Sequence, residues 1–188
     1  MTIEGTQSGR ARLLEAARSV FGRASFHEAS VSAVLEAAAL QPPTLYHHFG
    51  DKEGLYVAWA ESVLMEMGLR LSRSVPESGP TAQALASFAT SVLEPDAPDL
   101  PQILRDTPRL SRPESGESVL SAYFMSVYEP LCGVFVRGIQ RGDVLPDNVG
   151  RLADVFLAGC YGLGPLYGRG VFNLTEAARW WAERFVAR

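Results

Sequence analysis

The sequence predicts an all-α protein with a small three-helix domain at its N-terminus, joined by a long helix to a larger helical domain. Three observations predict this class. Two short helical stretches lie on either side of a tight break at residues 39–41. One uninterrupted helical pattern over residues 51–73 follows them at once. Beyond it, apolar stretches with helical spacing alternate with breaks that are rich in proline and glycine.

Apolar spacing predicts the first two helices of the small domain. The first is expected over residues 8–22, where leucine, alanine, valine and phenylalanine form one apolar side. The second begins after Ser30, which is a good N-cap. Its apolar residues recur at i, i+3, i+4 and i+7, so one face should be buried: Val31, Val34, Leu35 and Ala38.

The third helix, at residues 42–48, is under two turns long and begins with Pro42 and Pro43. Prolines are tolerated there because the first N–H groups of a helix have no partner within the helix. Since so short a helix cannot stand alone, we expect Leu45 and Phe49 to hold it while its other residues face outward. This is the helix-turn-helix arrangement that enters the major groove of DNA.

The long helix over residues 51–73 is expected to join the two domains without a flexible linker. Asp51 is a suitable cap for its N-terminus, where free N–H groups attract phosphate. Lys52, the only lysine in the chain, adds a positive charge at the same place. At a rise of about 1.5 Å per residue the helix is roughly 34 Å long.

The larger domain is predicted to contain five helices with aromatic and aliphatic stripes. They are expected at residues 81–93, 101–106, 117–141, 147–166, and from 173 or 175 to 187. Pro130 should kink the longest of them, and Gly142 should end it, so the triplet Arg-Gly-Asp at residues 141–143 is interpreted as a helix stop. Asp147 is expected to cap the helix that follows.

Composition and charge exclude several classes of protein. A hydrophobic content of 47% is typical of a soluble globular chain, and no stretch approaches the ~18 uninterrupted apolar residues of a membrane helix. The N-terminus lacks a secretory signal, so a cytoplasmic protein with no membrane partner is expected. The net charge is −4, and the few cations near the short helix predict a modest salt dependence of any DNA binding.

No catalytic residue, metal site or cofactor is expected. Hydrolase, metalloprotease, phosphate-loop and C-x-x-C motifs are all missing from the sequence. His47 and His48 are neighbours on one helix and point apart, so they cannot hold one metal ion together. Cys132 and Cys160 lie in apolar contexts without metal-ligand spacing, which favours two reduced core cysteines. We therefore do not expect an enzyme.

A short motif makes the interpretation more specific. Residues 44–55, T-L-Y-H-H-F-G-D-K-E-G-L, resemble the DNA-binding signature of the TetR family of bacterial transcriptional regulators. The likeness extends upstream to about Arg10, through L-L-E-A-A at residues 13–17. It implies a helix-turn-helix DNA-binding domain at residues 8–55 and a ligand-binding and dimerisation domain at residues 56–188. In this family the last two helices build a four-helix dimer interface.

The sequence departs from the family pattern in three places around the turn. Ala39 stands where glycine is usual, and a positive φ there would cost roughly 1 kcal/mol. Gln41 replaces a serine or threonine cap, and Pro43 replaces a small residue. These positions lie where groove contacts are made, so they affect base preference rather than fold.

Seven residues are predicted to contact DNA. Thr44, Tyr46 and Lys52 are assigned to phosphates, with His47, Pro43 and Gln41 near base edges and Pro42 beside them. Thr44 and Tyr46 also have structural interpretations, as a hydrogen-bonding residue within the helix and as an aromatic at the edge of the core. Arg10 and Arg12 fit either phosphate contacts or solvated surface positions.

Two further sets of residues are predicted in the larger domain. An apolar cavity is expected to be lined by aromatic residues: Trp59, Phe88, Tyr123, Phe124 and Tyr128. A dimer interface is expected through residues of the last two helices: Phe156, Gly159, Leu163, Ala177 and Trp181. The alternative interpretations are that the aromatic stripes are plain core and that Trp180 and Trp181 complete the core of a single chain.

Together these features predict a homodimeric, ligand-responsive regulator, by family habit a repressor. The helix at residues 42–48 would bind a palindromic DNA operator, and a small apolar or aromatic effector would release it by shifting the long helix. Two other classes stay open. One is a DNA-binding dimer without a small-molecule response, and the other is a sensor or enzyme that uses the cavity without binding DNA.

Overall fold

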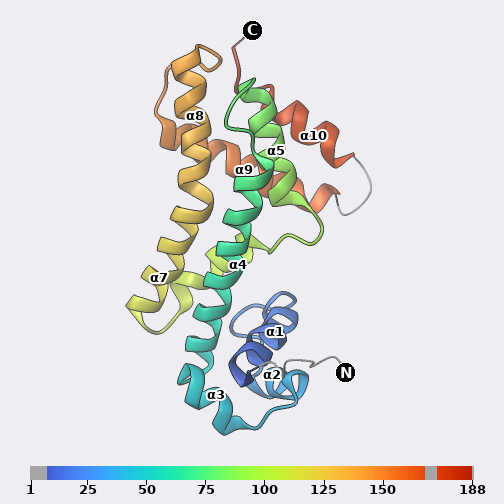
Figure 1. The fold of residues 1–188 in the computed structure, drawn as a ribbon, viewed down its shortest axis with the longest axis vertical. Helices are drawn as coiled ribbons and strands as arrows, with labels where there is room; N and C mark the ends of the chain where they lie inside the picture. The colour runs from blue at the N-terminus through green and yellow to red at the C-terminus, as the bar shows by residue number, and fades with distance from the viewer. Residues whose placement is uncertain (1–7, 168–172, 188) are drawn as a thin grey trace, which may run out of the picture. The chain divides into compact units, whose positions relative to one another are not determined.

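The computed structural model describes residues 8–167 and 173–187, with side chains for residues 8–162 and 173–187, and this part of the chain is helical without strands (Figure 1). The predicted all-α class is confirmed. The α-helices are α1 (Gly9–Phe21), α2 (Val31–Ala38), α3 (Pro42–Phe49), α4 (Lys52–Ser74), α5 (Thr81–Leu93), α6 (Leu100–Asp106), α7 (Pro113–Tyr123), α8 (Glu129–Arg141), α9 (Val149–Tyr167) and α10 (Leu174–Ala182). A 3₁₀ turn, η1 (Thr107–Arg109), follows α6, and a π-helical stretch, η2 (Phe124–Tyr128), joins α7 to α8.

Packing divides the chain into two compact units. The N-terminal unit combines residues 1–63 with residues 99–121, and the C-terminal unit combines residues 64–98 with residues 122–188. Along α4 the division between these units lies at residues 63 and 64, and the functional domain boundary at residues 55 and 56 stays a prediction. The links within the N-terminal unit include hydrogen bonds from Phe26 N–H and Tyr56 OH to Asp106 of α6, and from Arg112 to Asp51 beside α4.

The core of the N-terminal unit is built around α1 and the start of α4. Leu13 and Ala17 of α1 and Leu45 of α3 are fully buried, and Val34 of α2 is nearly so. Four aromatic rings complete this core, with neighbouring centroids 5.0 to 5.3 Å apart: Phe21, Phe26, Tyr56 and Trp59. A helix as short as α3 is thus held by tertiary contacts, as its length requires.

The turn between α2 and α3 contains a left-handed residue that is not glycine. Ala39 has φ 50° and ψ 47°, so the positive φ anticipated from the sequence is present. Arg12 of α1 supports this turn, because its guanidinium donates to the carbonyls of Ala38 and Ala39 at 2.5 and 3.1 Å. Arg12 therefore caps the end of α2, which gives it a structural role that the sequence did not reveal.

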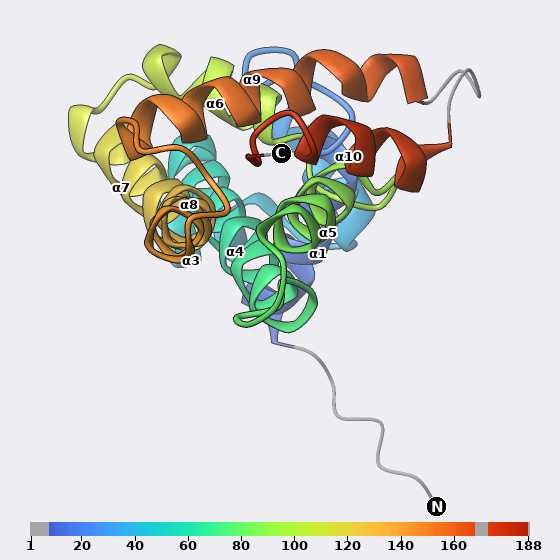
Figure 2. The same ribbon diagram turned by 90° about the horizontal axis from the view of Figure 1, so that it is seen from above.

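The C-terminal unit has an aromatic core between α5, α8, α9 and α10. Phe88, Phe135 and Phe156 are fully buried, and Phe156 contacts Trp181 and Phe185. Helix α10 lies alongside α5 and next to α9 (Figure 2). Phe88 and Phe135 both contact the Phe156 ring, with centroids 6.1 and 6.0 Å apart.

A π-helical stretch lies directly before α8, whose second residue is Pro130, at the place where the sequence predicts a kink. Proline has no N–H to donate to residue 126, and its ring crowds that carbonyl. The helix absorbs this defect by widening over Phe124–Tyr128 before α8 begins at Glu129. Gly68 of α4 packs tightly against this π-helical stretch in the same unit, since a Cβ on Gly68 would lie 3.1 Å from the Cβ of Ser126.

Most helix ends agree with the sequence analysis. Gly142 ends α8 in the left-handed region at φ 80°, which confirms the glycine stop. Asp51 caps the start of α4 by accepting from the N–H of Gly54 at 2.8 Å, and Asn173 caps α10. The cap of α9 was misplaced by one residue, because Asn148 rather than Asp147 accepts from Arg151 N–H.

One helical run passes a composition test for a membrane segment. Among the described residues, Pro113–Arg141 is long and apolar enough to cross a bilayer by length and composition alone. Four of its apolar residues, Val119, Val127, Leu131 and Phe135, are fully buried, whereas Leu120, Phe124, Met125 and Val136 are exposed.

Candidate nucleic-acid interface

Helix α3 presents the outer surface that the sequence predicted. Leu45 is fully buried and anchors it, while Tyr46 is 55% exposed. Thr44 is half-buried. The remaining outward residues are exposed: Gln41, Pro42, Pro43, His47 and His48. Six of the seven predicted DNA-contacting residues therefore lie on α3 or at its N-cap, close together on one side of the N-terminal unit.

The start of α3 differs from that of α1 and α2. Ser8 and Ser30 cap those helices by accepting a backbone N–H through their hydroxyls. Gln41, the N-cap of α3, makes no such bond to the described residues, and Pro42 and Pro43 carry no N–H at all. Since the next N–H, that of Thr44, donates to the Gln41 carbonyl at 3.0 Å, this helix start offers few donors for a phosphate.

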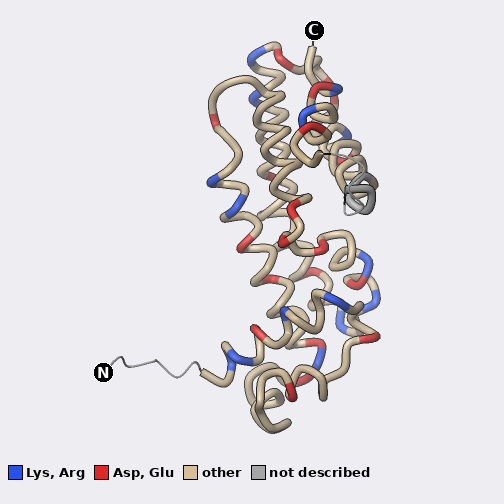
Figure 3. Tube along the Cα trace, turned by 90° about the vertical axis from the view of Figure 1, so that its right-hand side faces the viewer, with Lys and Arg blue, Asp and Glu red and all other residues tan. Residues whose placement is uncertain are grey.

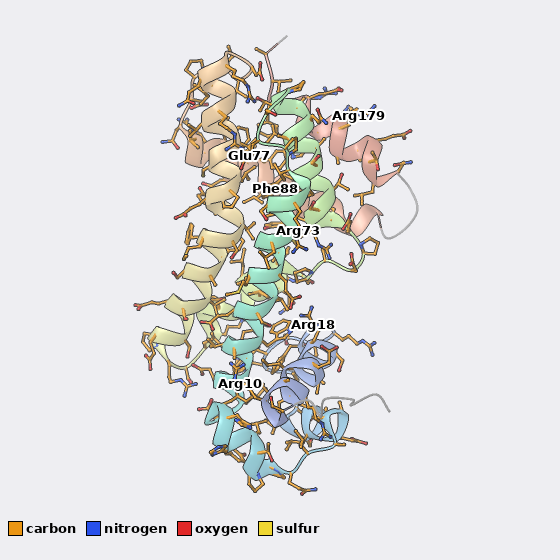
Figure 4. The ribbon with its side chains drawn as sticks, viewed as in Figure 1. Arg10, Arg18, Arg73, Glu77, Phe88 and Arg179 are labelled. Atoms are coloured by element: carbon orange, nitrogen blue, oxygen red, sulfur yellow. The ribbon has the colours of Figure 1, made fainter. Side chains whose placement is uncertain are left out.

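Charge near α3 comes from neighbouring helices, because Pro42–Phe49 contains no Lys, Arg, Asp or Glu (Figure 3). Arg10 of α1 is exposed, and its guanidinium lies 5.4 Å from the centroid of the Phe49 ring (Figure 4). Lys52 is half-buried, with its Nζ 4.6 Å from the centroid of Phe26. Burial lowers the pKa of Lys52. Arg10 is thus the more accessible cation, and our predicted set did not include it.

Gly54 of the sequence motif has a steric explanation. A Cβ at this position would lie 2.0 Å from the carbonyl oxygen of Phe49, the last residue of α3. Only glycine allows α4 to begin so close to the end of α3. The motif therefore encodes the angle at which the chain leaves α3 and enters α4.

Two carboxylates next to α3 are bound by a residue that the sequence analysis did not identify. The guanidinium of Arg112 makes a bidentate pair with Asp51, at 2.7 and 3.0 Å. Glu53, 6% exposed, accepts the N–H groups of Ser111 and Arg112 at 2.9 and 3.0 Å. No sequence signal links these positions, since about 60 residues separate them along the chain.

The electrostatics of this network favour the ionised carboxylates. The hydrogen bond from Arg112 lowers the pKa of Asp51. Burial acts to raise the pKa of Glu53, but hydrogen bonds from Ser111, Ser115 and the backbone of Arg112 lower it to about 2. Both groups are therefore charged at neutral pH, and Arg112 is fully engaged by them.

The predicted cavity residues belong to both units, with Trp59 in the N-terminal one and the other four in the C-terminal one. Trp59 belongs to the N-terminal unit, and its buried Nε1–H has no hydrogen-bond partner within the described residues. Phe88 packs against Phe156 in the C-terminal unit. Tyr123, Phe124 and Tyr128 form a row of ring contacts, with centroids 5.9 and 5.2 Å apart. The ligand-binding role of all five stays a prediction.

A polar hollow of about 580 Å³ lies elsewhere in the C-terminal unit, between α5 and α10. None of the five aromatic residues lines it. Its walls carry hydroxyl, amide and charged side chains, among them those of Ser74, Gln83, Thr90, Ser91 and Thr175. Arg179 of α10 also lines it (Figure 4). The chemistry of this hollow is unlike the apolar cavity that the sequence predicted.

The predicted dimer residues lie mostly inside their own chain. Phe156 is fully buried. A Cβ on Gly159 would lie 2.1 Å from the Trp181 ring, and Trp181 donates to the Phe156 carbonyl at 3.1 Å. Ala177 is half-buried, and the side chain of Leu163 lies outside the described residues. The alternative, in which Trp181 completes the core of a single chain, fits this geometry.

Other residues of the last two helices are exposed. On α9 these are Val155, Ala158 and Gly162, spaced by three and four residues on one face. On α10, Trp180 is 52% exposed, with the guanidinium of Arg184 4.3 Å from its ring. Across the part of the chain that the structure describes, no three His, Cys, Asp or Glu side chains gather to hold a metal ion.

Comparison with known proteins identifies the N-terminal segment. Residues 13–59 match the family described as bacterial regulatory proteins, tetR family. A segment of 52 residues is 48% identical to the HTH-type transcriptional regulator UidR of Escherichia coli, covering 28% of this chain and 26% of that protein. The chain thus spans about a quarter of the length of this relative.

Two further comparisons cover more of the chain. The HTH-type transcriptional regulatory protein RaaS of Mycobacterium tuberculosis is 28% identical over 151 residues, which is 80% of this chain and 66% of that protein. A TetR-family structure from Vibrio parahaemolyticus superposes with a TM-score of 0.75 at 17% identity, covering 96% of this chain and 100% of the other. The motif, the helix-turn-helix and the fold agree: residues 13–59 match the TetR family of bacterial regulatory proteins, and the chain shares the fold of TetR-family structures.

Proposed function

We propose that this protein is a homodimeric transcriptional regulator whose α3 helix reads a palindromic DNA operator in the major groove. The observation that carries the proposal is the surface of α3: Leu45 is buried beneath it, while its outer residues stay exposed. The relatives named as transcriptional regulators support the same role.

The residues at the start of α3 favour A·T base pairs. A glutamine amide is the standard bidentate partner of adenine N6 and N7, and the Gln41 amide is exposed and not used as a helix cap among the described residues. Pro42 and Pro43 are apolar and suit the methyl group of thymine. His47, one turn further on, is placed for a second base.

Few phosphates are expected to be neutralised. Thr44 and Tyr46 supply uncharged donors, and Arg10 and Lys52 supply the nearby cations. With two cations in each of two subunits, Z is about 4, and log K should fall with log salt at a slope of about −3.6.

A dimer would bring two α3 helices to successive major grooves, roughly 34–36 Å apart. The exposed face of α9 and α10 supports this assembly in addition to the residues first assigned to it, of which Phe156 is buried and Gly159, Ala177 and Trp181 are half-buried. Val155, Ala158 and Gly162 leave room for close helix packing, and Trp180 is the kind of large aromatic residue that anchors interfaces.

The proposal also includes a small-molecule effector that binds this protein and changes its affinity for DNA. We place a small apolar or aromatic effector near Trp59, because a buried indole N–H without a partner is costly unless a ligand or water accepts it. We propose that effector binding releases the protein from DNA, and that the protein is a repressor rather than an activator. Both points rest on what is usual in the TetR family. A regulator that lacks an effector remains the second candidate.

Selection of DNA from a random duplex library by the full chain tests the central claim. We expect an enriched palindrome with A·T pairs at the positions contacted by Gln41. His47→Ala should weaken binding to the enriched duplex about tenfold, whereas His27→Ala, an exposed histidine off α3, should leave it unchanged. If the wild-type protein enriches no sequence, the regulator proposal fails.

The assembly and the effector have separate tests. Val155→Glu should shift the mass measured by light scattering toward the monomer, while Leu145→Glu, on an exposed loop, should not. Thermal shifts across a panel of apolar compounds test the effector. A compound that stabilises the wild type should lose its effect in Trp59→Phe, and stabilisation by none would favour the candidate without an effector.

A further inference from the structure

The exit of α3 is fixed by a contact from a distant part of the sequence. Helix α3 ends at Phe49, Gly50 turns the chain at φ 78°, and Asp51 follows. Asp51 is bound on two sides, by the N–H of Gly54 at 2.8 Å and by the Arg112 guanidinium at 2.7 and 3.0 Å. All these residues belong to the N-terminal unit.

Arg112 is itself held in a single orientation. Its Nε lies 3.3 Å from Glu53 Oε1, and its own backbone N–H donates to the same carboxylate at 3.0 Å. Ser111 donates its N–H to the other oxygen of Glu53 at 2.9 Å. A planar guanidinium that grips two carboxylates is a geometric clamp which a lysine cannot reproduce.

We propose that Arg112 is a positioning residue for DNA binding, which sets the orientation of α3 by holding Asp51 and Glu53 at the junction of α3 and α4. This inference rests on the proposed function of α3. It goes beyond the family match, because that match ends at residue 59 and Arg112 lies between η1 and α7.

A direct phosphate contact is a poorer explanation of Arg112. Two carboxylates already occupy its guanidinium, so the trio Asp51, Glu53 and Arg112 carries a net negative charge at neutral pH. A group with a net negative charge repels the DNA backbone, so its role at this place is better explained by the geometry that it fixes. A misplacement of about 1 Å in a helix that must fit a groove removes hydrogen bonds to base edges, each of which depends on distance and angle.

The experiment measures affinity of full-length variants for the duplex enriched by the wild type. Arg112→Ala should bind at least about tenfold more weakly, and Arg112→Lys should fall between the two because charge remains but the fork is lost. Arg105→Ala is the matched control, since Arg105 is an exposed arginine of α6 that bonds only to Gln102 and Asp99 of its own segment among the contacts described. It should bind like the wild type.

Two readouts separate positioning from other roles. Asp51→Asn keeps a good helix cap but loses the charge, so the double variant Asp51→Asn/Arg112→Ala should be no weaker than the weaker single variant. The salt slope of Arg112→Ala should match the wild type, whereas Arg10→Ala should reduce the slope by about 2 per dimer. Melting temperatures, compared with that of Arg105→Ala, show whether lost affinity reflects lost folding.

The outcomes are distinct. If the wild type enriches DNA and Arg112→Ala binds it equally well, the positioning role is wrong and the proposed function stands. A flattened salt slope in Arg112→Ala, or additive effects with Asp51→Asn, would also overturn it in favour of a phosphate contact. If Arg112→Ala unfolds, the affinity of Asp51→Asn for the enriched duplex decides. Full affinity in this folded variant would contradict the positioning role of Arg112, and reduced affinity would support it. If the wild type enriches nothing, the proposed function fails and this inference falls with it.

Discussion

Helix α3 and helix α10 carry the two surfaces that the sequence analysis assigned to partners, and they differ in how well single residues could be placed. On α3 the predicted outward residues are outward, with Leu45 beneath them. On α10 the predicted Trp181 points into its own chain, and its neighbour Trp180 is exposed. On α3 the apolar residues that hold the helix, Leu45 and Phe49, are well separated from its outward residues, so its orientation is determined, whereas a helix with two adjacent tryptophans allows either one to pack inward.

The largest expected effect comes from removing a ring in the core beneath α10. Phe156→Ala should destabilise the chain by about 3–5 kcal/mol, because a fully buried ring is replaced by a cavity. Trp180→Ala should cost much less in the free energy of unfolding of a monomer. Urea unfolding of both variants measures this, and equal losses would mean that Trp180 is as buried as Phe156.

A second test concerns the junction of α3 and α4. Gly54→Ala should cost about 1–3 kcal/mol, since its Cβ would clash with the Phe49 carbonyl at 2.0 Å. Gly116→Ala, in the same unit, meets nothing closer than 3.6 Å and should be neutral or slightly stabilising. Thermal unfolding distinguishes them, and a neutral Gly54→Ala would show that the junction is not tight.

Acid unfolding tests the carboxylates beside α3. The pKa of Glu53 is lowered in the folded state from its ordinary 4.5 to about 2, so its ionised form stabilises the fold above pH 4.5. That contribution, on the order of 3 kcal/mol, should be lost as pH falls from 4.5 toward 2. Glu53→Gln should therefore be less stable than the wild type at pH 7 and nearly equal to it at pH 2. A difference that stays constant with pH would contradict the lowered pKa.

The smallest expected effect lies in the turn before α3. Ala39→Gly should stabilise the chain by up to about 1 kcal/mol, because glycine adopts the observed φ of 50° without the steric penalty of a Cβ. Ala37→Gly, at an exposed helical position of α2, is the control and should destabilise by about as much. A rise in melting temperature for the first and a fall for the second is the expected pattern.

Local patterns predicted much of the fold. The bounds of α2 and α3, the cap at Asp51 and the stop at Gly142 follow from residues within a few positions of each other, where spacing and capping preferences act directly. The π-helical stretch before Pro130 was expected only as a kink, because the hydrogen-bond shift that absorbs a proline depends on packing such as that of Gly68 against Ser126.

The candidate site was predicted less completely. Gln41, Tyr46 and His47 were recognised from the motif and their exposure on α3. Arg12 was left undecided between phosphate and solvent, yet it caps α2, and Arg112 was not considered at all. Both act through contacts between segments that are far apart in the chain, which periodicity cannot reveal.

By itself the sequence determined the helical class, the helix-turn-helix and its resemblance to the TetR family, because these depend on short-range spacing, caps and a contiguous motif. Only the tertiary structure decided which tryptophan packs into its own chain, which arginines are occupied and which segments complete the N-terminal unit. The physical reason is that a helix can bury any side of itself that a neighbour covers, and that neighbour is chosen by the whole chain.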